Sequence, residues 1–339
     1  MSEDIKKLPA ESFEKVHIDS SHSERITKPS LSFWQDAWLR IRKNKAAIVS
    51  MFVLVFILVM SIVGPMISPH DGETQTLTHA NLPPKVPGLE KLGIFDGVGK
   101  MAGKEVDLYE LKKVDTYYWF GTDGLGRDMF SRVWEGTQIS LFIAFMAALI
   151  DMVIGVAFGG ISGYYGGRVD DIMQRIVEIL YGIPTLVIVI LMLLFMKPGL
   201  TAIIIAITLT GWIGMSRIVR GQVLKFKNQE FVLASRTLGA TNGRIISKHI
   251  LPNILGIIII NTMFTIPGAI FFEAFLSFIG LGLQPPNASL GTLINDGYKL
   301  IQFQPHILLY PSIIISLLMI AFNLLGDGLR DAFDPKMKD

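Results

Sequence analysis

Residues 46–67 read AAIVSMFVLVFILVMSIVGPMI, and this stretch contains no charged side chain. An α-helix rises about 1.5 Å per residue, so about 20 apolar residues are needed to cross the roughly 30 Å hydrocarbon core of a bilayer. A soluble protein would have to bury such a helix on every side. The stretch therefore predicts a membrane-spanning helix, and it directs the interpretation of the rest of the chain.

Further apolar stretches of similar length follow along the sequence. They are residues 137–161, 176–196, 200–218, 254–278 and 307–325. Charged side chains within them are rare, and two carboxylates, Asp151 and Glu273, stand well inside apolar runs. The sequence therefore predicts an all-α, polytopic membrane protein with six transmembrane helices.

The overall composition agrees with this class. The 339 residues are 50% hydrophobic and 18% charged, and their mean hydropathy is +0.47. Soluble domains carry about 25% charged residues. A net charge of +2 is too small to indicate a nucleic-acid partner. The chain has no Cys, and its six His show no metal-ligand spacing, so we expect neither thiolate chemistry nor a metal site.

Basic residues near the ends of apolar stretches indicate the orientation, because short cytoplasmic loops are rich in Lys and Arg. Arg40, Arg42, Lys43 and Lys45 precede the first stretch, which starts too late for a cleavable signal peptide. Both termini are therefore expected in the cytoplasm. The predicted division is a cytoplasmic tail (1–45), a first helix (46–67), an extracytoplasmic segment (68–135), a transmembrane core (136–328) with a cytoplasmic loop (221–252), and a second tail (329–339).

The cytoplasmic loop contains a short helical pattern. Asn228 is a predicted N-cap, and Glu230 in the first turn suits the helix dipole. Helical spacing places Phe231, Ala234, Ser235 and Leu238 on one face, and Gly239 can adopt the left-handed conformation that ends a helix. A second short helix is expected before Pro252. These residues alone leave two interpretations open: a docking surface for another protein, or a helix on the lipid interface.

The same loop resembles the characteristic cytoplasmic loop of binding-protein-dependent ABC importers. That pattern is Glu-Ala-Ala, three residues, Gly, nine residues, Ile, one residue, Leu-Pro. Here Leu233-Ala234-Ser235 stands at the triplet, Gly239 at the Gly and Leu251-Pro252 at the end, whereas Leu233 and His249 depart from the Glu and the Ile. The resemblance implies a coupling helix that docks on an ATPase subunit. Its candidate residues are Glu230, Phe231, Leu233, Ala234, Ser235, Leu238, Gly239, Leu251 and Pro252.

A second stretch, WFGTDGLGRDMFSR at residues 119–132, precedes the second apolar run. By its residues it predicts a Gly-rich turn and a helix cap, with Asp123, Arg127, Asp128 and Arg132 as a solvated ion-pair cluster. It also resembles the peptide-type permease subunits, specifically the C-type partner of the pair. The signature residues are Gly121, Thr122, Asp123, Gly126, Arg127 and Asp128. The resemblance runs from about Phe33 to the C-terminus and implies the type I ABC importer permease fold.

The sequence has no phosphate-binding loop, because Gly99-Lys100 and Gly103-Lys104 lack the upstream Gly and the following hydroxyl. We therefore expect a non-catalytic subunit, with ATP and Mg²⁺ bound by separate partners. The resemblance implies a second homologous permease, two ABC ATPases and an extracytoplasmic substrate-binding protein, in the lipid of a prokaryotic cytoplasmic membrane. The implied substrate is an oligopeptide, with dipeptides or nickel chelates as alternatives.

Charged groups inside a membrane are costly and often functional. Asp151 and Glu273 are therefore candidates for lining a pathway or binding substrate amines, and a purely structural role stays open for both. A proton-driven secondary transporter is a rival interpretation, although inverted repeats typical of such carriers are not evident. An embedded enzyme or scaffold is another, but no catalytic motif is present. Gly155, Gly159 and Gly163 form a small-residue face whose packing partner, in this chain or another, stays open.

Overall fold

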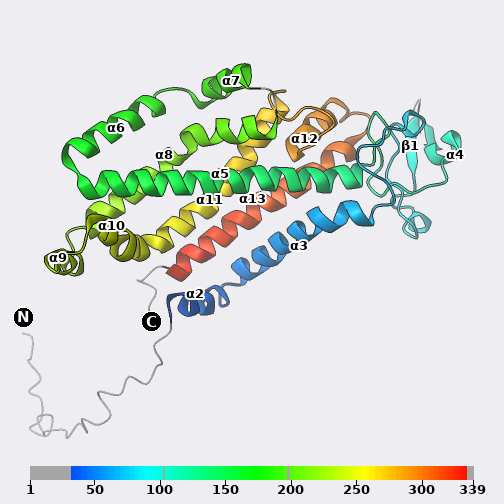
Figure 1. Cartoon of the computed structure of the whole chain (residues 1–339). Coiled ribbons are helices and arrows are strands. Elements are labelled where there is room, and N and C mark those ends of the chain that lie inside the picture. Colours follow the sequence, from blue (N-terminus) through cyan, green and yellow to red (C-terminus); the bar gives the residue numbers. More distant parts are fainter. Residues whose placement is uncertain (1–31, 102–103, 197–198, 334–339) are drawn as a thin grey trace, which may run out of the picture.

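The computed structural model describes residues 32–101, 104–196 and 199–333 (Figure 1). The predicted tails lie partly outside the described residues, at 1–31 and 334–339. The helices are α2 (Phe33–Ile41), α3 (Lys45–Ile67), α4 (Leu108–Lys112), α5 (Met129–Tyr165), α6 (Gly167–Tyr181), α7 (Thr185–Phe195), α8 (Leu200–Phe226), α9 (Glu230–Thr237), α10 (Asn242–Arg244), α11 (Leu251–Phe278), α12 (Leu290–Lys299) and α13 (Pro305–Phe333). The strands are β1 (Val98–Met101) and β2 (Lys104–Asp107), and short 3₁₀ turns cover Leu77–His79 and Glu90–Leu92.

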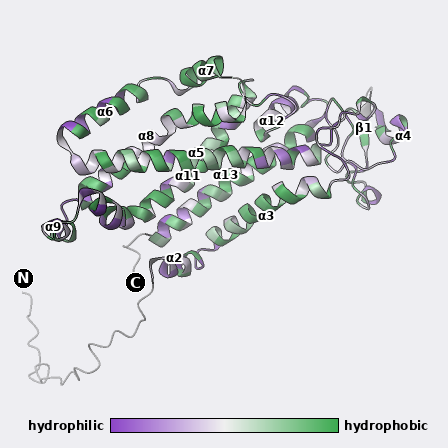
Figure 2. Ribbon diagram, viewed as in Figure 1, coloured by the Kyte–Doolittle hydropathy of each residue, from purple (hydrophilic) through white to green (hydrophobic). Residues whose placement is uncertain are grey.

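Five helical stretches among the described residues are long and apolar enough to cross a membrane. They are α3, α5, α8, the run Asn242–Phe278 and α13. The pair α6 and α7 meets the same criterion only when both are taken together, which brings the number to six. Figure 2 shows apolar residues along most of these helices. The prediction of an all-α polytopic membrane protein is confirmed.

The third predicted span, residues 176–196, is wrong as a single straight helix. α6 ends at Tyr181, α7 begins at Thr185, and the two are bent by 82° relative to each other. Pro184 lies at the break. Proline has no N–H to donate and disfavours helical backbone in the preceding residue, so the helix cannot run through Ile183 and Pro184. Near its start, α6 is tied to α8 by Asp170, which accepts hydrogen bonds of 2.7 and 2.6 Å from Arg220.

The long helix α5 lies along α8, α11 and α3 (Figure 1). Its small-residue face meets α8 of this chain: a β-carbon at Gly155 would lie 2.6 Å from Met215 Cβ, and one at Gly163 would lie 2.9 Å from the Arg220 carbonyl oxygen. The small-residue face of α5 therefore allows close packing against another helix of the same chain. The largest buried apolar cluster among the described residues includes Ile57, Ile143, Ile203, Ile270 and Leu318, from α3, α5, α8, α11 and α13, and it also reaches α7 and α12.

A small irregular unit, residues 68–128, connects α3 to α5, and we call it the β segment. β1 and β2 pair antiparallel, with Val98 opposite Asp107. The unit has its own core of Leu82, Tyr109, Val114 and Tyr118. In Figure 1 it occupies one end of the bundle, and α9 occupies the other. α5 begins at Met129, within the segment predicted at 68–135.

Most residues of the cytoplasmic loop predicted at 221–252 are helical. α8 extends to Phe226, and helical structure resumes at Asn242. A π-helical turn at Ile245–Ile250 leads directly into α11, with Pro252 in its first turn, where proline's missing N–H has no helical partner to lose. The second short helix is therefore part of one long helical run. α13 continues to Phe333.

Candidate functional site

The helix α9 projects at one end of the bundle and exposes apolar side chains (Figure 1). Phe231 is 40% exposed, Leu233 44% and Leu238 88%. Glu230 and Ala234 are also exposed, and Ser235 is half-buried. The predicted face of Phe231, Ala234, Ser235 and Leu238 therefore points mostly away from the bundle. The predicted cap is wrong: Gln229 occupies the N-cap position and makes no side-chain hydrogen bond there.

Two contacts anchor α9 to the rest of the molecule. Val232 is fully buried in an apolar cluster with Val223, Ile245 and Ile250. On the same helix, the Arg236 guanidinium lies 5.8 Å from the ring centre of Tyr164, and Tyr164 in turn donates a 3.0 Å hydrogen bond to Asn242 Oδ1. The end of α5 is thus linked directly to α9. These contacts fix the orientation of the exposed face.

Gly239 ends α9 as predicted. Its φ is +82°, in the left-handed region that favours glycine. The Gly239 and Ala240 amides bond back to the carbonyl oxygens of Arg236 and Ser235. A β-carbon at Gly239 would meet no atom within 4 Å, so the glycine is required by the backbone conformation alone. Leu251 is half-buried and Pro252 exposed at the start of α11.

The signature residues 121–128 join the β segment to the start of α5. Gly121 and Gly126 have φ of +77° and +76°, and β-carbons on them would collide with the carbonyl oxygens of Leu82 and Thr76. The Thr122 hydroxyl donates to the His79 carbonyl at 2.5 Å and accepts from Leu82 N at 2.8 Å. Asp128 caps α5 by accepting from Ser131 N at 3.0 Å, and it also accepts from the Ser68 hydroxyl at 2.8 Å. The predicted turn and helix cap are confirmed.

The expectation of a solvated ion-pair cluster at this place is wrong. Asp123, Arg127, Asp128 and Arg132 are each less than 10% exposed. Asp123 accepts from the backbone N–H of Leu125 at 2.9 Å and from Arg127 Nε at 2.7 Å, and Arg132 Nε lies 3.6 Å from the same carboxylate. Burial makes this pairing structurally important, because a partner lost here leaves an uncompensated charge.

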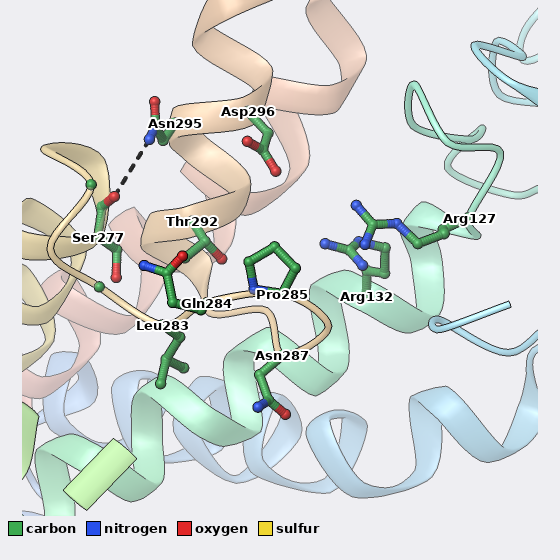
Figure 3. A pocket seen from close by; sticks show the side chains of 12 residues that line it. Arg127, Arg132, Ser277, Leu283, Gln284, Pro285, Asn287, Thr292, Asn295 and Asp296 are labelled. Carbon is green, nitrogen blue, oxygen red and sulfur yellow. Dashed lines mark hydrogen bonds between the residues drawn. The ribbon is translucent and has the colours of Figure 1, made fainter. Parts of the chain in front are cut away.

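A pocket of about 190 Å³ adjoins these arginines. Figure 3 shows Arg127 and Arg132 side by side, facing Pro285 of the connection between α11 and α12, with Asp296 of α12 above them. Asn295 of α12 donates a 3.5 Å hydrogen bond to the Ser277 carbonyl. The pocket therefore lies between the signature residues and the end of α11.

The two membrane carboxylates have different surroundings. Glu273 on α11 is fully buried, and its oxygens accept hydrogen bonds from the hydroxyls of Ser140 at 2.9 Å and Ser277 at 2.7 Å. Ser140 also accepts from Leu290 N at 3.2 Å, so Glu273 holds α5, α11 and α12 together. This arrangement matches the structural role left open for it.

Asp151 on α5 is 3% exposed and lines a different cavity, together with residues of α6, α7, α8 and α11. Its Oδ1 atom is buried without a hydrogen-bond partner in the described part of the chain. The structure therefore does not bring Asp151 and Glu273 into one site. Within the described ranges, no group of three or more His, Asp or Glu side chains is placed to hold a metal ion.

Several residues that organise these sites were not identified from the sequence. Ser140 and Ser277 satisfy Glu273, and Tyr164 and Arg236 anchor α9. A serine within an apolar run is a usable signal for a buried hydrogen bond. The Tyr164–Arg236 contact joins residues 72 positions apart and has no local signature.

Comparison with known proteins identifies the family to which this architecture belongs. Residues 155–339 match the family model described as binding-protein-dependent transport system inner membrane component, and residues 32–84 match the N-terminal TM domain of oligopeptide transport permease C. The chain is similar to a structure of the MetNI methionine ABC transporter in an inward-facing conformation, with a TM-score of 0.50 and 22% identity over 61% of this chain and 98% of that one. That likeness concerns the fold, which is the type I ABC permease fold.

Full-length relatives show closer similarity. The dipeptide transport system permease protein DppC of Bacillus subtilis is 49% identical over 98% of this chain and 95% of its own length. The oligopeptide transport system permease protein OppC of the same organism is 46% identical over 98% of this chain and all of its own, and OppC of Escherichia coli is 37% identical over 93% and 95%. These relatives are transport components and not catalysts. The chain therefore belongs to the binding-protein-dependent inner membrane transport components, as a multi-pass C-type permease subunit of the peptide ABC importers.

Proposed function

We propose that this chain is the permease subunit of an ATP-driven, binding-protein-dependent importer that translocates oligopeptides, and that α9 with Gly239 is its coupling element. The observation that carries the proposal is the apolar face of α9, held rigidly at one end of the bundle by Val232 and Arg236. Exposed Phe231 and Leu238, seven positions apart and so on one side of the helix, suit a groove on a protein partner, because apolar side chains gain free energy when a partner removes them from water.

The opposite ends of the bundle then have different partners. Two ABC ATPases, which carry the ATP and Mg²⁺, bind at the α9 end, and both termini lie on that cytoplasmic side. The substrate-binding protein docks at the end formed by the β segment. A second, homologous permease completes the pathway. The signature residues Gly121, Thr122, Asp123, Gly126, Arg127 and Asp128 fix the start of α5 within this arrangement.

The coupling role is tested by co-purification from native membranes in mild detergent. We expect a tagged wild-type chain to retain an ATPase, and the double variant Phe231→Asp, Leu238→Asp to lose it, because both side chains are exposed and their replacement should not disturb the fold. Leu77→Asp is a matched control, since Leu77 is 71% exposed in the β segment at the opposite end. Retention of the ATPase by the double variant would contradict the proposal, as would its absence from the wild type.

Dipeptide import is the second candidate function. It is favoured by the DppC relative of Bacillus subtilis, which is 49% identical, compared with 46% for OppC. Uptake by proteoliposomes containing the complete importer distinguishes the two: a dipeptide transporter transports Ala-Ala and excludes a pentapeptide, whereas an oligopeptide transporter accepts both. The measurement requires the chain's own binding protein, because that partner makes the first selection of substrate.

A further inference from the structure

A cavity beside Asp151 opens among the helices of the bundle. Its volume is about 700 Å³, within the range of about 300–1,000 Å³ that is usual for small-molecule sites. It lies where the bend between α6 and α7 approaches α8 and α11, and Pro184 and Thr185 of the bend line it.

Asp151 contributes to the lining of this cavity, and one oxygen of its carboxylate lacks a hydrogen bond. The side chain lies against Gly211 of α8, where a β-carbon would collide with the carboxylate, so glycine leaves room for the charge. Oδ1 is buried and accepts no hydrogen bond from the described residues. A buried carboxylate without a donor is costly, and a cation at this place would relieve the cost. Glu273 differs, since two serine hydroxyls already satisfy it.

Arg217 lines the same cavity from α8. Its guanidinium lies 4.4 Å from the ring centre of Tyr181 on α6. The Arg217 side chain is exposed, and among the described residues it makes no hydrogen bond or ion pair. The face of the guanidinium is occupied by the ring, but its N–H groups remain available for an anion. Asp151 and Arg217 are the two charged residues among the cavity's lining.

The spacing of the two residues along the axis of α8 is comparable to the length of a short peptide. Gly211, which adjoins Asp151, and Arg217 are six residues apart on α8, which corresponds to a rise of about 9 Å. An extended peptide advances about 3.3–3.6 Å per residue, so the charged ends of a di- or tripeptide lie about 7–10 Å apart. Thr210 and Thr265 add hydroxyl groups for the peptide backbone.

We propose that this cavity is a transit site for zwitterionic di- and tripeptides, in which Asp151 receives the amino-terminal ammonium and Arg217 the terminal carboxylate. The inference rests on the proposed import function and adds to it the recognition of the substrate's ends by the permease itself. Both residues hold the peptide by charge-assisted hydrogen bonds and take part in no bond breaking.

The test uses the complete importer in liposomes with three probes: free tri-alanine, its N-acetyl derivative and its C-terminal amide. Binding-protein affinity for each probe is measured separately, and uptake is measured at saturating binding protein. In the wild type we expect N-acetylation and C-amidation each to lower ATP-driven uptake by about tenfold, the usual effect of losing one charge-assisted hydrogen bond. Equal uptake of all three probes by the wild type would overturn the proposal without any variant being needed.

Variants then show which residue recognises which end of the peptide. Asp151→Asn is expected to lose discrimination against the acetylated probe only, and Arg217→Gln against the amide only. Glu273→Gln is the matched control, since it neutralises an equally buried carboxylate outside the cavity and should leave both ratios unchanged. An equal loss for all probes in Asp151→Asn would show that Asp151 pairs with a basic group of the second permease, which also overturns the proposal. Absence of any peptide uptake by the wild type would instead contradict the import function.

Discussion

Gly159 of α5 lies against the backbone carbonyl of Ser216 on α8 so closely that a β-carbon has no room between the two helices. Gly160, the next residue, has room for a β-carbon, because the nearest atom to it would be Ile246 Cγ2 at an ordinary contact distance of 3.9 Å. Adjacent glycines on one helix therefore have different roles. Only the first is required by packing.

This difference gives a matched pair of substitutions. Gly159→Ala should destabilise the chain by about 1–3 kcal/mol, as expected for overpacking of a tight interface. Gly160→Ala should be neutral or slightly stabilising, because alanine is the better helix former. Thermal inactivation in detergent measures both. Equal midpoints for the two variants would contradict the close contact.

Gly239→Ala should impair coupling more than assembly. The substitution forces a β-carbon into left-handed backbone, at a cost of roughly 1–2 kcal/mol, although the surrounding space is open. We therefore expect α9 to tilt or fray at its end and peptide uptake per ATP hydrolysed to fall. Gly243→Ala is the control, since Gly243 lies in α10 with free space around it and without positive φ. Unchanged uptake per ATP in the Gly239 variant would argue against a coupling role.

Removing the charge of Asp123 should strongly destabilise the folded chain. Asp123→Asn weakens the partner of two buried arginines, Arg127 and Arg132, and breaking a buried pair costs about 3–5 kcal/mol. Asp296→Asn removes an exposed pairing with Lys299 at 3.7 Å and should cost less than about 1 kcal/mol. Expression level and thermal inactivation report the contrast. Similar stabilities would mean that the cluster is effectively solvated.

The β segment should lose stability in mild acid. Desolvation lowers the pKa of His79 below its ordinary value of 6.5, and the charges of His70 and Lys112 lower it further. The native state therefore binds fewer protons there than the unfolded chain does. The contribution of neutral His79 to the stability of the β segment is complete above the pKa of the unfolded chain. It is lost as the pH falls through the pKa of the native state.

Hydrogen exchange of the β segment between pH 7 and 4.5 measures this effect. His79→Gln should flatten the dependence while its amide can still reach the Tyr118 hydroxyl, which lies 2.8 Å from His79 Nδ1. The same slope in the variant and in the wild type would assign the titration to other groups.

The sequence predicted most of the fold because a membrane span has a strong local signal. The apolar runs around α3, α5, α8, α11 and α13 are each long enough to be recognised without knowledge of their neighbours. The prediction of the third span is wrong because the backbone preference of Ile183-Pro184 breaks the helix, although the length and hydropathy of the run alone predict a single helix. That signal was present in the sequence.

The candidate sites are harder to predict from the sequence than the fold. Gly239 could be identified because its conformation is a local property of a helix end. Ser140 and Glu273 are 133 residues apart, and their contact depends on how α5 and α11 cross, which no local pattern encodes. The burial of Asp123 and Arg127 was missed for the same reason: the β segment that covers them packs through distant residues such as Leu82 and Thr76.

The length of α5 has a mechanical consequence. Its 37 residues make a single rod about 55 Å long, longer than the roughly 40–45 Å of a bilayer with its headgroups. One end is clamped to the β segment through Asp128, and the other touches α9 through Tyr164. A stiff lever of this length cannot tilt at one end alone: a rotation of about 5° about one end displaces the other by about 5 Å. A displacement of α9 that moves this end of α5 is therefore transmitted to the β segment at the other end of the helix.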